Sequence, residues 1–199
     1  METIHAGEPC QVQAHYPELI MRLTQLVHDR IRESLRPGDL AIDATVGNGH
    51  DTRLLAELVG ATGHVHGFDI QHEALLHTRQ HLDQDLPGAN VELHLAGHEA
   101  MAGHLPCAMI DATAAIVFNL GYLPGGDKSV TTQAETTLAA LKLAWETYLR
   151  PGGLLCVLCY PGHPGGEEEA RQVADWLDSL DTEVIQHASP GPVLHLAIK

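Results

Sequence analysis

The chain is 199 residues long, 44% of them are hydrophobic, and its formal net charge is −15. This length suits one α/β domain with a full-sized core, and no apolar run of about eighteen residues is present to span a membrane. The acidity excludes the broadly basic surface that nucleic-acid-binding proteins usually show. Because the first residues lack a basic segment followed by an apolar one, we expect a cytoplasmic protein without a membrane partner.

The N-terminal region divides into a tail and a helix. Residues 1–15 carry no apolar period, so we expect a flexible tail ahead of a single domain over residues 16–199. From Pro17 to Ser34, apolar residues recur at spacings of three and four, which predicts an amphipathic helix. Four arginines cluster in and just after this helix, namely Arg22, Arg30, Arg32 and Arg36. They form either a local basic patch or an ordinary solvated helix face.

Beyond Asp39, short apolar strands alternate with helical segments. The expected elements are strand Leu40–Ile42, helix Asp51–Val59, strand His64–Asp69, helix Gln71–Leu86, strand Val91–Leu95, a loop or short helix Gly97–His104, strand Ala114–Asn119, helix Val130–Leu149, strand Leu154–Tyr160, helix Glu167–Leu180, and strands Thr182–Gln186 and Val193–Ile198. This alternation predicts a mostly parallel sheet with helices on both faces. A short turn joins the last two strands, so we expect one antiparallel strand near the C-terminus.

The four cysteines are too few and too scattered for a disulfide framework; they are Cys10, Cys107, Cys156 and Cys159. Cys156 and Cys159 form a C-x-x-C motif that invites a zinc or redox interpretation. They lie, however, inside the buried-strand pattern LLCVLCY, where residues three apart point to opposite faces. No second pair completes a metal site, so we expect packed cysteines and no metal.

The most informative stretch is DLAIDATVGNGHDT, from Asp39 to Thr52. It predicts a strand followed by a Gly-x-Gly turn into a helix, where a cofactor can lie against bare backbone. A dinucleotide favours a third glycine, and that place holds Thr52. Asp43, four residues before Gly47, would repel a pyrophosphate and attract a cationic ligand, which favours S-adenosylmethionine (SAM). A plain strand–helix turn remains the alternative.

Two later positions extend this pattern. Asp69 ends the second strand, twenty residues after Gly49, where an acidic residue accepts hydrogen bonds from ribose hydroxyls. His98 and Glu99 follow the third strand, where an adenine ring would lie; a loop with a helix-capping acid is the alternative. The combination of Asp43, the two glycines and Asp69 is more specific than any of them alone.

The segment Asn119-Leu-Gly-Tyr122 ends the fourth predicted strand. Methyl transfer to nitrogen requires an amine lone pair aimed at the sulfonium methyl, and the side-chain oxygen of Asn119 can accept an N–H and hold that geometry. Tyr122 can stack on a flat base. Amino-methylating enzymes have Asp/Asn-Pro-Pro-Tyr/Phe here, and NLGY is similar with both prolines replaced. A strand-ending Asn in a turn is the alternative.

Two glycine-rich loops complete the predicted rim. Gly125-Gly-Asp-Lys128 can cradle an anion such as a substrate phosphate, or it is a lid whose glycines simply bend. Tyr160-Pro-Gly-His-Pro-Gly-Gly166 contains His163, which can take a proton from an ammonium acceptor or serve only the loop's structure.

Five segments in this order carry a family resemblance: DATVGNGHDT, GFDIQ, GHEAM, FNLGYLPGGDKSVTT and YPGHPGGEEEA. They resemble the small bacterial rRNA methylase family, whose members include tRNA 5-aminomethyl-2-thiouridine methyltransferases. The resemblance covers about residues 20 to 199. It implies a class I SAM-dependent methyltransferase fold of the Rossmann-like type, with a seven-stranded, mostly parallel sheet. It also implies methylation of the 5-aminomethyl nitrogen of uridine 34, with a tRNA anticodon stem-loop as partner.

The resemblance also implies roles for individual residues. Those lining the methionine end of SAM would be Asp43, Gly47, Asn48, Gly49, His50, Asp51 and Thr52. Asp69 and Gln71 would meet the ribose and adenine, with His98 and Glu99 nearby. Those facing the acceptor would be Asn119, Tyr122, Asp127, Lys128, Tyr160 and His163, with Asn119, Tyr122 and His163 closest to the chemistry.

Other functions have weaker support. An rRNA methyltransferase, or a small-molecule amine methyltransferase on the same fold, is the main alternative, and the net charge of −15 favours the latter. Thr52 and Asp43 disfavour a NAD-type oxidoreductase. A non-catalytic RNA-binding module would need more basic residues and would not explain the spacing of Asp69. The tRNA isoacceptors, the proton acceptor and the choice between monomer and homodimer are left open.

Overall fold

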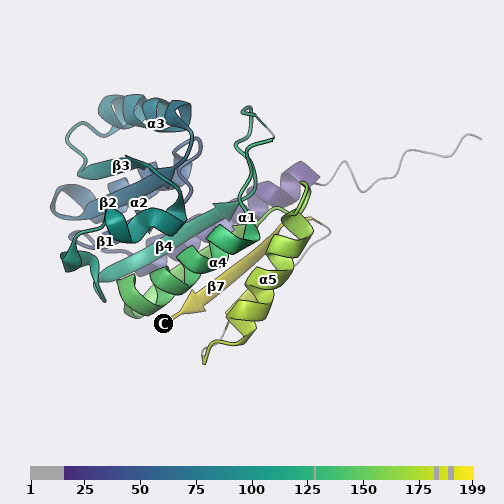
Figure 1. Ribbon diagram of the computed structural model, residues 1–199. Coiled ribbons are helices and arrows are strands. Elements are labelled where there is room, and N and C mark those ends of the chain that lie inside the picture. The colour runs from purple at the N-terminus through teal and green to yellow at the C-terminus, as the bar shows by residue number, and fades with distance from the viewer. Residues whose placement is uncertain (1–15, 128, 182–183, 188–190) are drawn as a thin grey trace, which may run out of the picture.

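A single twisted sheet organises the molecule in the computed structural model, which describes residues 16–127, 129–181, 184–187 and 191–199 (Figure 1). Within these residues the sheet has seven strands in the order β3-β2-β1-β4-β5-β7-β6. The strands are β1 Leu40–Asp43, β2 His64–Asp69, β3 Val91–Leu95, β4 Thr113–Leu120, β5 Leu149–Cys159, β6 Val184–His187 and β7 Val193–Ile198. Strands β1 to β5 pair in parallel, and β7 runs antiparallel to both β5 and β6. The predicted mostly parallel sheet with one antiparallel strand is therefore confirmed.

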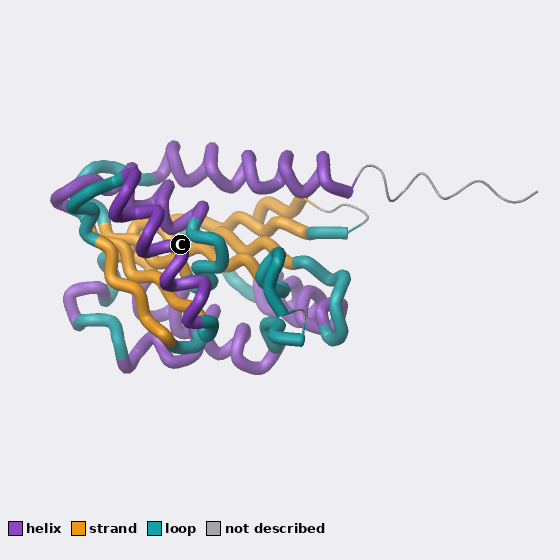
Figure 2. The backbone as a smooth tube through the Cα atoms, turned by 90° about the horizontal axis from the view of Figure 1, so that it is seen from above, coloured by secondary structure: helices purple, strands orange, loops and turns teal. Residues whose placement is uncertain are grey.

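Helices cover both faces of the sheet. One face carries α1 Tyr16–Ser34, α2 His50–Val59 and α3 His72–Asp85, while the other carries α4 Ala134–Leu143 and α5 Gly166–Asp178. Seen from above, α1 runs along one side of the strands, with other helices on the opposite side (Figure 2). The shorter helices are η2 Gly60–Thr62, η3 His98–Gly103, η4 Cys107–Met109 and the single π-helical turn η5 Ala144–Tyr148. In the described part of the chain, no helix is long and apolar enough to cross a bilayer.

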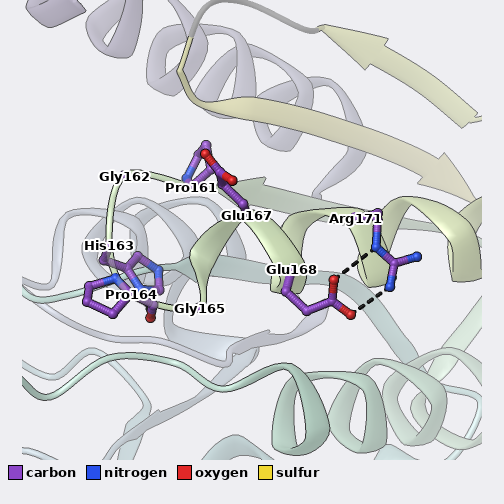
Figure 3. Close-up of a pocket in the computed structure, with 8 residues that line it drawn as sticks. All are labelled: Pro161, Gly162, His163, Pro164, Gly165, Glu167, Glu168 and Arg171. Atoms are coloured by element: carbon purple, nitrogen blue, oxygen red, sulfur yellow. Dashed lines mark hydrogen bonds and ion pairs between the residues drawn. The ribbon is translucent and has the colours of Figure 1, made fainter.

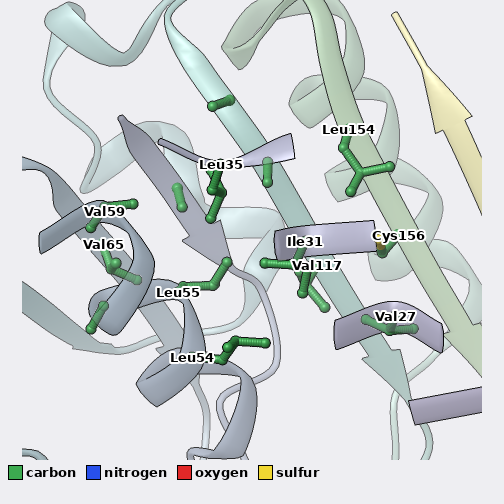
Figure 4. Packing of buried hydrophobic residues seen from close by; sticks show 14 of the residues in the cluster. Val27, Ile31, Leu35, Leu54, Leu55, Val59, Val65, Val117, Leu154 and Cys156 are labelled. Atoms are coloured by element: carbon green, nitrogen blue, oxygen red, sulfur yellow. The ribbon is translucent and has the colours of Figure 1, made fainter. Parts of the chain in front are cut away.

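The apolar run of β4 is buried on both faces because successive side chains alternate. Val117 joins the cluster under α1 and α2 (Figure 4), whereas Ile116 and Phe118 join the cluster under α4 and α5. Cys156 and Cys159 divide between the two clusters in the same way. Burial raises the pKa of both thiols far above its usual range, so they remain packed, protonated groups.

The segment between β4 and β5 differs from its prediction. The single helix predicted over Val130–Leu149 begins only at Ala134, ends in the π-helical turn, and β5 starts at Leu149. In the β4–β5 register, Thr113 pairs with Leu149 and Ala115 with Leu154, so the intervening Pro-Gly-Gly residues bulge out of the ladder. The glycines instead bond the end of β7: the Gly152 N–H donates to the Lys199 carbonyl, and the Lys199 N–H donates to Gly153.

Strand β5 also begins five residues before its predicted start at Leu154, and the remaining predicted boundaries lie within one or two residues of those found. The strands over His64–Asp69, Val91–Leu95 and Val193–Ile198 match their predictions. The predicted loop or short helix over Gly97–His104 is the 3₁₀ helix η3. The predicted tail at residues 1–15, Lys128 and the first residues of the strand predicted from Thr182 lie outside the described residues.

Candidate active site

The loop between β1 and α2 has two glycines in the left-handed region, Gly47 at φ 52° and Gly49 at φ 77°. A Cβ on Gly49 would lie 2.4 Å from Oγ1 of Thr78 on α3, so this position is closed to any side chain by helix packing. A Cβ on Gly47 would lie 3.5 Å from Leu123 and 3.8 Å from the Thr45 carbonyl oxygen, both ordinary contact distances. Gly49 therefore allows α2 to pack closely against α3. The backbone of Gly47 has no side chain to cover it on the side that faces the loop after β4.

Asp43 ends β1 and is completely buried. Its carboxylate accepts hydrogen bonds from the Thr45 N–H at 3.1 Å and from the Thr52 hydroxyl at 2.6 Å. Burial, and next the nearby charge of Asp51, raise the pKa of Asp43 to about 7. Asp43 thus ties the loop together from the interior, because its oxygens bond Thr45 and Thr52 and do not reach the surface.

Asp69 ends β2 beside this loop. One oxygen accepts the Gly47 N–H and the other the Gln71 N–H, both at 2.8 Å. A carboxylate has about four lone-pair sites, so Asp69 retains capacity for two ribose hydroxyls while it holds the loop. Next to Gly47, Asn48 is half-buried and His50 is exposed.

Asn119, near the end of β4, connects to the same loop in two ways. Its backbone N–H donates to the Thr45 hydroxyl at 2.6 Å, and its side-chain Nδ2 donates to Oδ2 of Asp51. The other oxygen of Asp51 lies 2.6 Å from Nε2 of His28 on α1. Residues from α1, α2 and β4 therefore meet at one buried carboxylate. Sequence reasoning missed His28, because its contact with Asp51 joins residues 23 positions apart and leaves no local pattern.

His98 and Glu99 follow β3 in η3. The His98 ring is buried, with its centroid 5.7 Å from that of Phe118, and burial lowers its pKa. The exposed Glu99 folds its carboxylate back over Gly97, where a Cβ would lie 2.3 Å from it. Glu99 is thus the more accessible of the two, and an adenine contact for either remains a prediction.

The loop between β4 and α4 is closed at its base and exposed at its tip (Figure 1). Tyr122 and Thr131 form an antiparallel bridge, and the Thr132 N–H donates to the Gly121 carbonyl at 3.0 Å. At the tip, Asp127 accepts the Ser129 N–H and hydroxyl, which lowers its pKa. Tyr122 is 37% exposed at the base of the loop, where it can meet a substrate.

The loop after β5 lies beside it. The Tyr160 N–H donates to the Leu120 carbonyl, and its ring lies against Gly121. Nδ1 of His163 is 3.1 Å from the Pro164 carbonyl oxygen, and its Nε2 is 3.9 Å from Glu169. Pro161 to Gly165 and the first turns of α5 line a hollow of about 750 Å³, with Glu168 paired to Arg171 on its wall (Figure 3). None of the residues of the β1–α2 loop lines it, so this hollow is separate from that loop.

One cluster among the described residues has metal-ligand character, away from the loops above. Ligand atoms of His64, His66 and Glu92 lie within 4.8 Å of one another. The His64 and His66 rings are stacked 4.4 Å apart, and lone pairs lie in the ring planes, so these nitrogens do not converge on one point. These histidines therefore pack against one another and do not form a metal site.

The predicted site residues fall into two groups. Asp43, Asp51, Thr52, Asp69, Gln71 and Asn119 meet around the β1–α2 loop through hydrogen bonds. Tyr122, Asp127, Tyr160 and His163 lie on the two loops that follow β4 and β5. The strand order, and a glycine loop at the carboxyl end of β1 that is held by the acidic residue ending β2, are typical of one class of protein. This class is the class I SAM-dependent methyltransferases.

Comparison with known sequences gives the family. The family described as "Putative rRNA methylase" matches residues 65–191, more than half of the chain, and the chain belongs to it. A curated relative is the chloroplastic tRNA (mnm(5)s(2)U34)-methyltransferase of Arabidopsis thaliana, 38% identical over 173 residues. The match covers 78% of this chain and spans 62% of the length of that relative.

Solved structures agree on the fold. A "putative rRNA-methylase" of Clostridium thermocellum is 39% identical, with a TM-score of 0.80 over 88% of this chain and 96% of that one. A "putative methyltransferase" of Streptococcus mutans, solved in complex with SAH, is 35% identical, with a TM-score of 0.77 over 88% of this chain and 97% of its own. The class I fold expected from the sequence is confirmed.

Proposed function

We propose that this protein methylates the 5-aminomethyl group of 2-thiouridine at wobble position 34 of tRNA, giving 5-methylaminomethyl-2-thiouridine, with SAM as methyl donor. The observation that carries the substrate is the 38% identity to the Arabidopsis tRNA (mnm(5)s(2)U34)-methyltransferase. The tRNA anticodon stem-loop is then the partner, and the cytoplasm the place of action.

The residues around the β1–α2 loop fit SAM. Asp69 would bind the ribose hydroxyls while holding Gly47, and Gln71 and Glu99 border the adenine side. The raised pKa of Asp43 marks a buried carboxyl that lacks a positive partner, and a cationic ligand supplies one. When bound, SAM supplies an electrophilic methyl group; Asn48, His50, Asp51 and Thr52 would lie at its methionine end.

The chain's own residues orient the acceptor. Because Nδ2 of Asn119 donates to Asp51, its Oδ1 faces away from that carboxylate and is the atom that would accept an N–H from the aminomethyl group. Tyr122 would stack on the uracil ring, and Tyr160 and Asp127 would border the nucleotide. The amine is itself the nucleophile, so no covalent enzyme intermediate forms, in keeping with the buried thiols of Cys156 and Cys159.

The test uses labelled SAM and tRNA from cells that lack the final methylation. We expect one new methyl group on the aminomethyl uridine, detected by nucleoside mass spectrometry, and none on rRNA or on a free alkylamine. Methylation of rRNA alone, or of the free amine alone, would replace this proposal with the corresponding alternative. The Asp69→Ala variant serves as the control that lacks a ribose-binding carboxylate.

A further inference from the structure

The buried carboxylate of Asp51 connects the acceptor side of the site to the surface of α1. One of its oxygens receives the side chain of Asn119, and the other lies 2.6 Å from Nε2 of His28. The Asp51 side chain is 10% exposed and that of His28 is 19% exposed. The three side chains thus form a continuous polar path that starts beside the acceptor and ends at solvent.

The proposed chemistry requires such a path. An alkylamine resembles the Lys side chain, with a pKa of about 10.4, so it arrives mainly as an ammonium ion without a free lone pair. A base within direct reach, or one water away, must take a proton before the nitrogen can attack. The amide group of Asn119 separates an amine held by its Oδ1 from the Asp51 carboxylate, which bonds Nδ2, so the proton transfer runs through one bridging water.

We propose that Asp51 accepts the proton lost by the acceptor ammonium and passes it to His28, which releases it to solvent. This inference rests on the proposed function. The N–H bond breaks and its electron pair remains on nitrogen; this pair then forms the N–CH₃ bond as the S–CH₃ bond breaks and SAM becomes the neutral thioether SAH. The product leaves as a secondary ammonium ion, and one proton has moved from substrate to water.

The surroundings of Asp51 favour this route. The titratable groups that face it are His28 from α1, Asp43 from β1 and the thiol of Cys156 from β5. Asp43 is completely buried and Cys156 is 1% exposed, so His28 is the group among these three that can exchange a proton with water. His163 instead lies 3.1 Å from the Pro164 carbonyl oxygen and 3.9 Å from Glu169.

The decisive variant is His28→Gln, which keeps an amide N–H for Asp51 but cannot carry a proton at neutral pH. We expect unchanged SAM affinity and a single-turnover rate about 100-fold lower at pH 7. This rate should recover toward that of the wild type as the pH approaches the pKa of the amine. Exogenous imidazole should also rescue His28→Ala, which a purely structural role would not allow. The matched control is His77→Gln on the exposed surface of α3.

The outcomes separate this inference from the function on which it rests. If the wild-type protein transfers no methyl group to the aminomethyl uridine, the proposed function fails. If it does, and His28→Gln retains the wild-type rate and pH profile while imidazole has no effect on His28→Ala, the proton route is wrong. Should both variants fail to fold, the pH profile of the wild type decides: a single-turnover rate that does not change between pH 6 and 9 overturns the route.

Discussion

Asp69 and Asn119 stand on opposite sides of the proposed methyl transfer, and their substitutions should separate binding from turnover. Asp69→Ala removes the proposed ribose acceptor and releases the Gly47 N–H, so we expect SAM affinity to fall about tenfold or more. Asn119→Ala keeps the backbone bond to Thr45, so SAM affinity should change little while turnover falls. Calorimetry with SAM and single-turnover methylation measure the two effects. An equal loss of SAM affinity in both variants would contradict the assignment of Asn119 to the acceptor.

Asp43 should couple SAM binding to pH. Its pKa is raised to about 7 by burial and by Asp51, so the unliganded protein holds a proton there below that pH, and stability falls as the pH rises from about 4, the ordinary pKa of Asp, to about 7. A cationic ligand favours the carboxylate and expels the proton. Well below pH 7, we therefore expect the dissociation constant of SAM to rise about tenfold for each unit by which the pH falls. In Asp43→Asn, affinity should be weaker at pH 8 and nearly independent of pH between 5.5 and 8.

At the scale of elements, Glu169 joins α5 to the loop between β4 and α4 and to α4 itself. It is 2% exposed and accepts the hydroxyls of Thr132 at 2.7 Å and Thr137 at 2.6 Å. Glu169→Ala leaves two hydroxyls without this acceptor, which should lower the free energy of unfolding by about 3 kcal/mol. Denaturant unfolding measures the change. The neighbouring Glu168→Ala removes an exposed pair with Arg171 and should have almost no effect; equal losses in both variants would contradict this role.

The edge pair β2–β3 should make the fold sensitive to acid. His66 is 2% exposed and contacts His94 at 3.0 Å, and burial lowers the pKa of His66 to about 4 and lowers that of His94. The unfolded chain binds protons near pH 6.5, so this stability is complete above pH 6.5 and is lost as the pH falls toward 4. Thermal unfolding from pH 7 to pH 4.5 measures the loss, which should be smaller in His66→Phe and unchanged in the exposed His77→Gln. An equal loss in His66→Phe would exclude this ring as the cause.

Local patterns predicted these elements because each pattern is a property of neighbouring residues. The apolar run of β4 and the Gly47–Gly49 turn have the same meaning wherever they occur in an α/β chain. Contacts between distant residues leave no such pattern: His28 meets Asp51 across 23 positions, and Asn119 meets it across 68. The same limit explains Gly49, whose missing side chain makes room for Thr78 of α3. The bulge in β5 forms hydrogen bonds with Lys199 at the end of β7. The residues around Pro151 give no indication of this distant partner.

For the whole molecule, the arrangement of charge constrains how the proposed tRNA partner would bind. The net charge is −15, and two of the four arginines of the predicted cluster pair with acidic neighbours on α1. Arg30 pairs with Glu33 at 2.9 Å and Arg32 with Asp29 at 3.3 Å. Within the described residues, this helix therefore presents mixed charge rather than a basic face. Recognition should then depend more on the modified base held between the loops after β4 and β5 than on the phosphate backbone.

This charge arrangement predicts a weak dependence of tRNA binding on salt. When the logarithm of the affinity is plotted against the logarithm of the salt concentration, each phosphate contact adds about −0.7 to −0.9 to the slope. With few such contacts, we expect a slope of about −2 for an anticodon stem-loop, or a loss of roughly 16-fold between 50 and 200 mM salt. Fluorescence anisotropy measures it. A hairpin with unmodified uridine should bind more weakly with the same slope, because only base contacts differ. A slope steeper than about −5 would instead require an extended basic surface, and RNA recognition through the base would be wrong.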